Sequence, residues 1–124
     1  MEEYTLKKSK LESLLNEYKK YMDLMNYIET SHKINMNDFV VLNCIHEHCT
    51  KEKMLMQPFL KIATDAFELS RTKVLASIRK LVSQERVSKV RSNTDERKVY
   101  LFMDESNIEK LNAMLNDIDK YLEK

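Results

Sequence analysis

The chain has 124 residues, enough for one domain around a single core, and its 43% hydrophobic and 33% charged residues are not those of an intrinsically disordered protein. No apolar run approaches the ~20 residues that span a bilayer, and the charged N-terminus lacks the apolar segment of a signal peptide, so we expect a cytoplasmic protein. With no glycine and one proline there are few helix breakers, and long helices with tight connections are expected.

The first expected element is a helix from about residue 4 to residue 30. Its apolar residues recur at spacings of four and three over roughly two heptads. Such a stripe is too short for a free coiled coil but suits packing against one partner helix. The residues of the stripe are Leu11, Leu15, Tyr18, Met22 and Met25.

A second helix is expected to begin near Asn35, a good N-cap, with Asp38 at the place of a capping box, and to end around residues 48–50. Its last turns contain two cysteines and two histidines. Cys44 and His48 would share a face, but the other two would not join them, whereas a closed zinc site needs four ligands. Ordinary packing is therefore favoured, with a metal site or a reactive thiol as alternatives, and the cysteines are expected to be reduced and unpaired.

A helix-turn-helix is expected over residues 54–84. Pro58 fits the first turn of a helix that covers residues 59–65, Phe67 and Leu69 would pin the turn, and Ser70 would cap the next helix. That next helix has one apolar face, which is expected to pack inward, and an opposite face that is polar and basic. The inward residues are Val74, Ile78, Leu81 and Val82.

A hairpin, or wing, is expected over residues 86–103. An alternating run at residues 87–91 is followed by turn-forming residues 92–95 and by a β-branched and aromatic run at residues 99–102. Because the chain has no glycine, Asn93 is the residue best able to adopt a left-handed conformation at the tip. A helix that leads into a basic hairpin is the layout of a winged helix.

Residues 70–98 contain nine basic and three acidic residues, a formal charge of +6, while the rest of the chain, with 12 basic and 17 acidic residues, sums to −5. The positive stretch is where a polyanion would bind. On the basic helix, Thr72, Lys73 and Ala76 would reach base edges beside Arg71, and Arg79 and Lys80 would contact phosphates. A charged face that is merely solvated is the alternative. The predicted DNA-contacting residues are Ser70, Arg71, Thr72, Lys73, Ala76, Arg79 and Lys80.

On the wing, the predicted contacts to phosphates or to a neighbouring minor groove come from Lys89, Arg91, Arg97 and Lys98. Asp95 and Glu96 would be repelled by phosphates. Their better role is to orient Arg91 and Arg97 through charge-assisted hydrogen bonds.

A final helix is expected over residues 104–124. The apolar stripes of the first and last helices are longer than a compact core can cover, so we expect them to form a homodimer interface. The alternative folds both stripes onto the chain's own core. The predicted interface residues are Leu11, Leu15, Tyr18, Met22, Ile108, Leu111, Leu115, Ile118 and Leu122.

Three segments resemble a known family: the tract from Lys89 to Arg97, with its Asp-Glu-Arg end, residues 36–42, and residues 69–73. They are similar to the staphylococcal accessory regulators of the SarA type, which are relatives of the MarR winged-helix repressors. The resemblance extends over nearly the full chain. It implies a dimeric transcription factor on A/T-rich promoter DNA that controls virulence, autolysis or biofilm genes, and it implies a DNA-binding role for Arg91, Asp95, Glu96 and Arg97. Members that sense redox state carry a cysteine in the first helix, where this chain has none.

No constellation of an enzyme is present: there is no glycine for a phosphate loop, no nucleophile elbow and no isolated carboxylate pair. We therefore expect a mainly helical fold with a small β-hairpin wing, in a single winged-helix domain over residues 1–124 with dimerisation helices at 1–30 and 104–124. The expected function is that of a homodimeric, sequence-specific DNA-binding regulator without a cofactor. Activation or repression, the operator and any small-molecule effector stay open. The alternative is a protein–protein interaction module that regulates a partner through its apolar helices without binding DNA.

Overall fold

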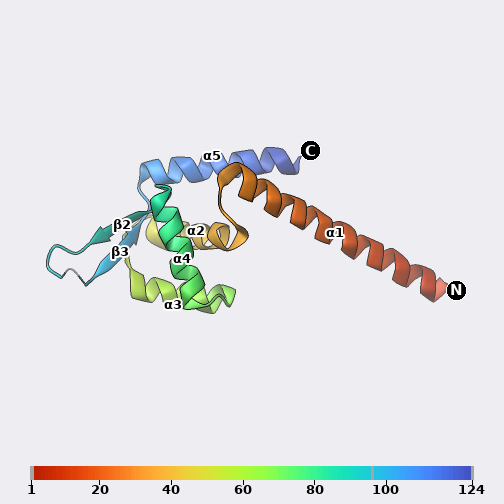
Figure 1. The fold of residues 1–124 in the computed structure, drawn as a ribbon, viewed down its shortest axis with the longest axis horizontal. Helices are drawn as coiled ribbons and strands as arrows, with labels where there is room; N and C mark the ends of the chain where they lie inside the picture. The colour runs from red at the N-terminus through yellow and green to blue at the C-terminus, as the bar shows by residue number, and fades with distance from the viewer. Residues whose placement is uncertain (1, 96, 124) are drawn as a thin grey trace. The chain divides into compact units, whose positions relative to one another are not determined.

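The computed structural model describes residues 2–95 and 97–123, and it is mainly helical with one small sheet, which confirms the predicted fold class (Figure 1). The chain divides into two compact units, Met1–Asn35 and Met36–Lys124. The elements in order are α1 (Glu2–His32), α2 (Met36–Cys49), β1 (Met54–Leu55), α3 (Met56–Phe67), α4 (Arg71–Ser83), β2 (Ser88–Arg91), β3 (Val99–Phe102) and α5 (Glu105–Leu122).

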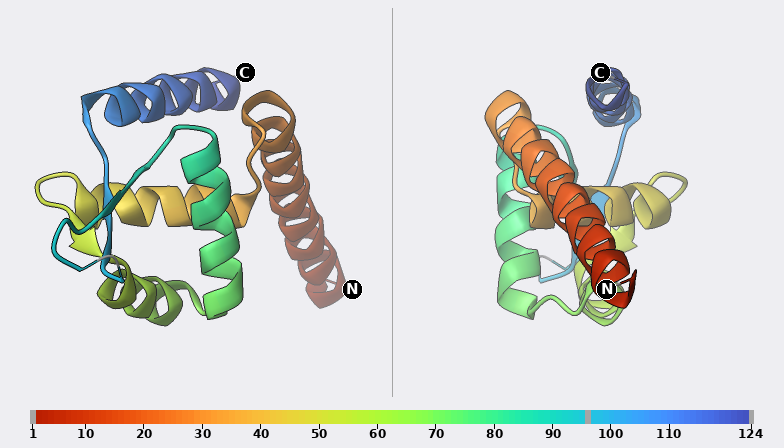
Figure 2. Two further views of the ribbon diagram at one scale, coloured as in Figure 1. Left: turned by 60° about the vertical axis from the view of Figure 1, so that its left-hand side comes forward. Right: turned by 90° about the vertical axis from the view of Figure 1, so that its right-hand side faces the viewer.

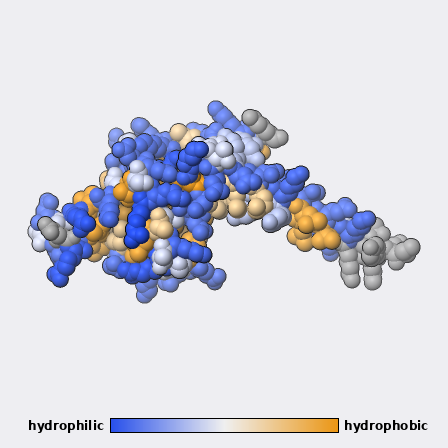
Figure 3. Space-filling view, in the orientation of Figure 1, coloured by the Kyte–Doolittle hydropathy of each residue, from blue (hydrophilic) through white to orange (hydrophobic). Residues whose placement is uncertain are grey.

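The first unit contains the single helix α1, whose 31 residues extend slightly beyond the predicted range. Large apolar side chains are exposed along it and form an apolar patch, of which the hydrophobic part is orange in Figure 3. Leu14 and Tyr21 belong to this patch although the predicted stripe omitted them, because strict four-three spacing describes a narrower face than the helix presents. The exposed members are Leu11, Leu14, Leu15, Tyr18 and Tyr21.

The second unit is built around α2, α3 and α4, with α4 packed across α2 (Figure 2). The inward face predicted for α4 is confirmed, since Val74, Ile78 and Leu81 are buried. Pro58 lies in the first turn of α3, also as predicted. Phe67 was expected to pin the turn between α3 and α4, but it is 42% exposed, and that expectation is wrong.

The sheet has three antiparallel strands in the order β1-β3-β2. β2 and β3 form the predicted hairpin, with Lys89 opposite Leu101 and Arg91 opposite Val99. The sequence did not predict β1, because two residues are too few for an alternating pattern. It pairs Met54 with Leu101 and so covers the other edge of β3, whose Leu101 is fully buried.

Among the described residues, positive φ occurs in three turns, at Lys33 (61°), Glu68 (53°) and Glu85 (60°). Asn93 is not among the described residues with positive φ, so the prediction of a left-handed Asn93 is wrong. The tip instead turns on side-chain acceptors. Ser92 Oγ accepts hydrogen bonds from the backbone N–H groups of Thr94 and Asp95, at 3.2 and 3.3 Å.

Helix α5 begins with a capping box. Asp104 Oδ1 accepts from Asn107 N at 2.8 Å, and Asn107 Oδ1 accepts from Asp104 N at 2.9 Å. Among the residues that the structure describes, no helix is long and apolar enough to cross a membrane.

Candidate nucleic-acid interface

The basic helix α4 starts with a partial cap. Ser70 Oγ accepts from Lys73 N at 3.2 Å, and the first turn contains no acidic residue. Instead, Arg71 and Lys73 place positive charge at the positive end of the helix dipole, an arrangement that costs a few tenths of a kcal/mol to about 1 kcal/mol per charge. An external anion at this end would offset that cost.

The outward face of α4 is open to solvent. The residues of this face lie opposite the buried Val74, Ile78 and Leu81. The helix therefore packs through its apolar side, and its polar side is free to contact a ligand. The exposed predicted contact residues are Ser70, Arg71, Thr72, Lys73, Ala76 and Arg79.

Lys80 differs from its neighbours, because its Nζ lies 2.7 Å from Asp38 Oδ2 on α2. Asp38 is only 2% exposed, so this amino group neutralises a buried carboxylate. The pair ties α4 to α2 across 42 positions of sequence. A lone acidic residue within the apolar run of α2 was the only sequence signal for it, and spacing within a helix could not identify the partner.

Replacing Lys80 by methionine should lower the free energy of unfolding by about 1–3 kcal/mol, because the apolar stem is kept while Asp38 is left buried without its cation. Urea denaturation of the single variants Lys80→Met and Asp38→Asn and of the double variant measures the coupling. The double variant should recover part of the loss. Strictly additive effects would mean that the two groups do not stabilise each other.

The wing carries four exposed cations, Lys89, Arg91, Arg97 and Lys98. Asp95 lies beside one of them: its Oδ1 is 3.3 Å from Arg97 Nε and also accepts from Arg97 N at 3.0 Å. Arg97 is 93% exposed, so the contact orients the side chain rather than burying it. Glu96, predicted to act alongside Asp95, lies outside the described residues.

Helix and wing open onto shared hollows. One, of about 340 Å³, is lined by Leu75 of α4, by residues at the start of α3 and by the wing residues Lys89, Arg97 and Lys98. A second, of about 270 Å³, is lined by both Arg79 of α4 and Lys89 of β2. Arg79 of α4 and Lys89 of β2 therefore border the same hollow, and Arg97 and Lys98 of the wing border the one that Lys89 also lines.

Arg86 lies in the connection between α4 and β2 and makes a contact within the protein. Its Nε donates to Gln84 Oε1 at 3.0 Å, and partial burial lowers the pKa of its guanidinium. It is half-buried, unlike the cations of the wing.

Both cysteines of α2 are free and buried, while His46 and His48 are exposed. Burial, with a smaller contribution from Glu47, raises the pKa of the Cys44 thiol. Burial, with a smaller contribution from Cys44, raises that of Cys49 to about 11. Both thiols are therefore protonated at neutral pH, the opposite of a reactive cysteine. No group of three possible metal ligands occurs among the residues described.

At pH 8, iodoacetamide should alkylate Cys49 of the native protein at least about 100-fold more slowly than in urea, because a pKa near 11 against the ordinary 9.0 reduces the thiolate by that factor before access is considered. The thiol of Cys49 ionises near pH 9 in the unfolded chain but only near pH 11 in the folded protein. The free energy of unfolding should therefore be highest below pH 9 and fall as the pH rises toward 11. Timed mass spectrometry measures the rates. Equal native and unfolded rates would identify an accessible, reactive thiol.

The predicted dimer residues fall into two groups. Leu11, Leu15 and Tyr18 of α1 are exposed, as is Leu122 of α5. Leu111 and Ile118 are buried in the single chain, and they are therefore core residues. The half-buried residues are Met22, Ile108 and Leu115.

Comparison with known proteins identifies the family of the chain. Residues 23–114 match the family described as "Transcriptional regulator SarA/Rot". The HTH-type transcriptional regulator SarX of Staphylococcus aureus (strain bovine RF122 / ET3-1) is 50% identical over 113 residues, which cover 91% of this chain and 95% of SarX. These relatives are named as transcriptional regulators, a non-enzymatic role.

Two solved structures share the fold. Reduced AbfR bound to DNA superposes with a TM-score of 0.62 at 15% identity, over 96% of this chain and 81% of AbfR. Staphylococcus aureus MarR in complex with salicylate and kanamycin superposes with a TM-score of 0.66 at 17% identity, over 96% of this chain and 75% of MarR. At such identities they establish the fold alone, a winged helix of the MarR type. With its family match and its similarity to SarX, the chain belongs to the SarA/Rot family of transcriptional regulators.

Proposed function

We propose that the protein binds A/T-rich promoter DNA sequence-specifically as a homodimer, in the cytoplasm, and regulates virulence, autolysis or biofilm genes. The observation that carries this proposal is the shared hollow, which Arg79 of α4 and Lys89 of the wing both line. A duplex that docks there would meet both elements at once. AbfR, which has the same fold, has been solved bound to DNA, and this supports DNA as the ligand.

The roles divide by position on the two elements. Near the N-terminus of α4, Arg71, Thr72, Lys73 and Ala76 are exposed and would read base edges in a major groove. Ser70, which caps the helix, would contact the backbone beside them. The phosphate contacts would come from Arg79, Lys89, Arg91, Arg97 and Lys98, which do not discriminate between sequences.

Lys80 is not included among the proposed phosphate contacts, because its amino group already pairs with Asp38. Its proposed role is to hold α4 against α2. Of the cations of α4, Lys80 would therefore stabilise the fold, while Arg71, Lys73 and Arg79 would bind the DNA.

The exposed stripe of α1 supports the homodimer. Five large apolar side chains that stay in water are a poor surface for a monomer, and a second copy can cover them through the same surface. A two-fold dimer would place its two recognition helices in successive major grooves, about one helical turn apart.

Fluorescence anisotropy with an A/T-rich duplex at ~150 mM salt tests the proposal. Saturable binding that exceeds the binding to a G/C-rich duplex of equal length is the expected result. The exposed α1 stripe would also fit an interaction module that regulates a partner protein. Failure to bind either duplex would favour that second function.

A further inference from the structure

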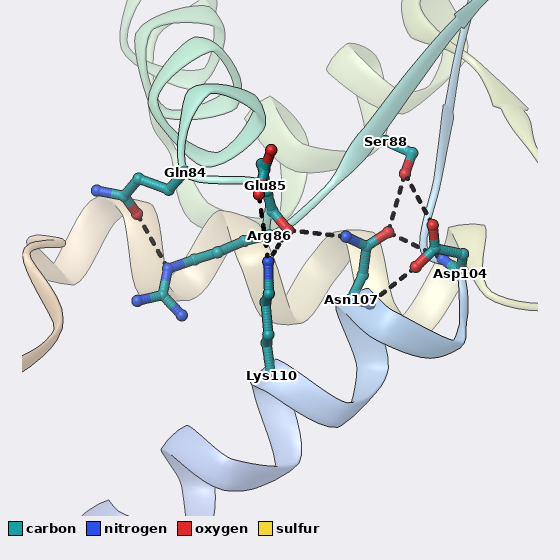
Figure 4. A network of polar contacts seen from close by, with 7 residues as sticks. All are labelled: Gln84, Glu85, Arg86, Ser88, Asp104, Asn107 and Lys110. Atoms are coloured by element: carbon teal, nitrogen blue, oxygen red, sulfur yellow. Dashed lines mark hydrogen bonds and ion pairs between the residues drawn. The ribbon is translucent and has the colours of Figure 1, made fainter.

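A polar network joins the first turn of α5 to the end of α4 and to both legs of the wing (Figure 4). At its centre is Asn107, which is only 5% exposed. Its Oδ1 accepts from Ser88 Oγ at 3.0 Å and from Asp104 N at 2.9 Å, and its Nδ2 donates to the carbonyl oxygen of Glu85 at 2.9 Å. One side chain thus contacts the turn after α4, the start of β2 and the N-cap of its own helix.

The segment on the α4 side is strained. Glu85 has a φ of 60°, which is unfavourable by roughly 1–2 kcal/mol for a residue with a Cβ. Its carbonyl oxygen accepts from both Asn107 Nδ2 and Lys110 Nζ, the latter at 3.1 Å. The turn is closed by its own backbone, since Glu85 N and Arg86 N donate to the carbonyl oxygens of Val82 and Leu81 at 3.0 and 2.9 Å. The two donors from α5 attach this turn, and with it the direction in which the chain leaves α4, to the first turns of α5.

On the wing side, the network contacts the two ends of the hairpin. Ser88 is the first residue of β2, and Asp104 follows β3 by two positions. Ser88 Oγ donates to Asn107 Oδ1 and, at 3.4 Å, to Asp104 Oδ2. The base of the hairpin is therefore fixed to the same side chain that holds the end of α4.

We propose that Asn107 is a positioning residue for DNA recognition: from α5 it fixes the wing relative to α4, so that the two basic elements engage the duplex as one rigid body. The proposal rests on the proposed function, because it needs a duplex that touches both elements.

A helix cap alone would need only the Asn107 contacts to Asp104. Asn107→Asp separates the two roles, because it keeps an acceptor for Asp104 N and Ser88 Oγ but replaces the donor to Glu85 with a carboxylate oxygen. The matched control is Asn112→Asp, the same change at an exposed position of the same helix.

Hydrogen–deuterium exchange gives the first readout and needs no DNA. In Asn107→Asp, amides of residues 85–91 and 99–102 should exchange about tenfold faster or more, while those of α4 before residue 82 and the Asn112→Asp control stay at wild-type rates. If Asn107→Asp does not fold, Ser88→Ala, which removes the contacts of β2 to Asn107 and Asp104 but keeps the Asn107 bond to Glu85, tests the wing side of the network by the same exchange measurement. Unchanged wing exchange would overturn the proposal even in a protein that binds DNA.

The second readout is a double-mutant cycle in DNA affinity. Asn107→Asp should weaken binding about tenfold in the wild-type background and less than about twofold where Lys89→Ala and Arg91→Ala have already removed wing contacts. An equal loss in both backgrounds would contradict action through the wing. If the wild type binds no duplex, the proposed function fails, and the exchange experiment alone decides whether Asn107 holds the wing.

Discussion

Reversing the charge of Arg79 and Lys89 together is expected to lower the affinity for an A/T-rich duplex by more than about 100-fold at ~150 mM salt. The two side chains line one hollow from different elements, so the double reversal replaces two phosphate contacts with two repulsions at the junction of helix and wing. Because phosphates are the partners, affinity for unrelated duplexes should fall by a similar factor. Fluorescence anisotropy with Arg79→Glu/Lys89→Glu measures both.

The matched control for that experiment is Lys51→Glu, an exposed cation between α2 and β1 that lines neither of the two hollows. It changes the same kind of charge and should alter affinity less than about threefold. If the double reversal had no more effect per charge than this control, the junction of α4 and the wing would not be where the duplex docks.

Replacing Leu15 by glutamate is expected to convert the protein to a monomer and to lower its affinity for a two-half-site duplex by about 100-fold or more, since one protomer can then hold only one half-site. Leu15 is 57% exposed in the single chain, so the charge should not disturb the chain's own fold. A buried carboxylate at a dimer interface is strongly unfavourable. Sedimentation and anisotropy on the same sample measure the two effects.

Asn16→Glu is the matched control for Leu15→Glu. It lies next in sequence but about 100° around the helix, away from the centre of the apolar stripe, and it is also exposed. This variant should stay dimeric. A wild-type protein that sediments as a monomer at micromolar concentration would contradict the proposed homodimer, whatever the oligomeric state of the variants.

Local patterns predicted most of the second unit. The apolar face of α4, the Ser70 cap, Pro58 at the start of α3 and both hairpin strands depend on residues close in sequence, and all are present in the structure. These features follow from periodicity and capping, which one segment determines largely by itself.

The features that sequence reasoning missed depend on residues far apart in the chain. The Lys80–Asp38 pair spans 42 positions, and Asn107 contacts Glu85 across 22. A two-residue β1 is a strand only because β3 lies beside it. The prediction of a left-handed Asn93 at the wing tip was wrong for another reason. Side-chain hydroxyl and carboxylate groups accept backbone hydrogen bonds in this turn, and Asn93 does not adopt the left-handed conformation.

The salt dependence of binding shows directly whether helix and wing dock on one duplex, because it counts the phosphates that the basic surface neutralises. Five proposed contacts per protomer, from Arg79, Lys89, Arg91, Arg97 and Lys98, predict that log Kobs of the dimer falls against log [salt] with a slope of about −9 on an A/T-rich duplex. Removing the four wing cations should bring the slope to about −2. A wild-type slope already between 0 and −2 would contradict docking of helix and wing on one duplex.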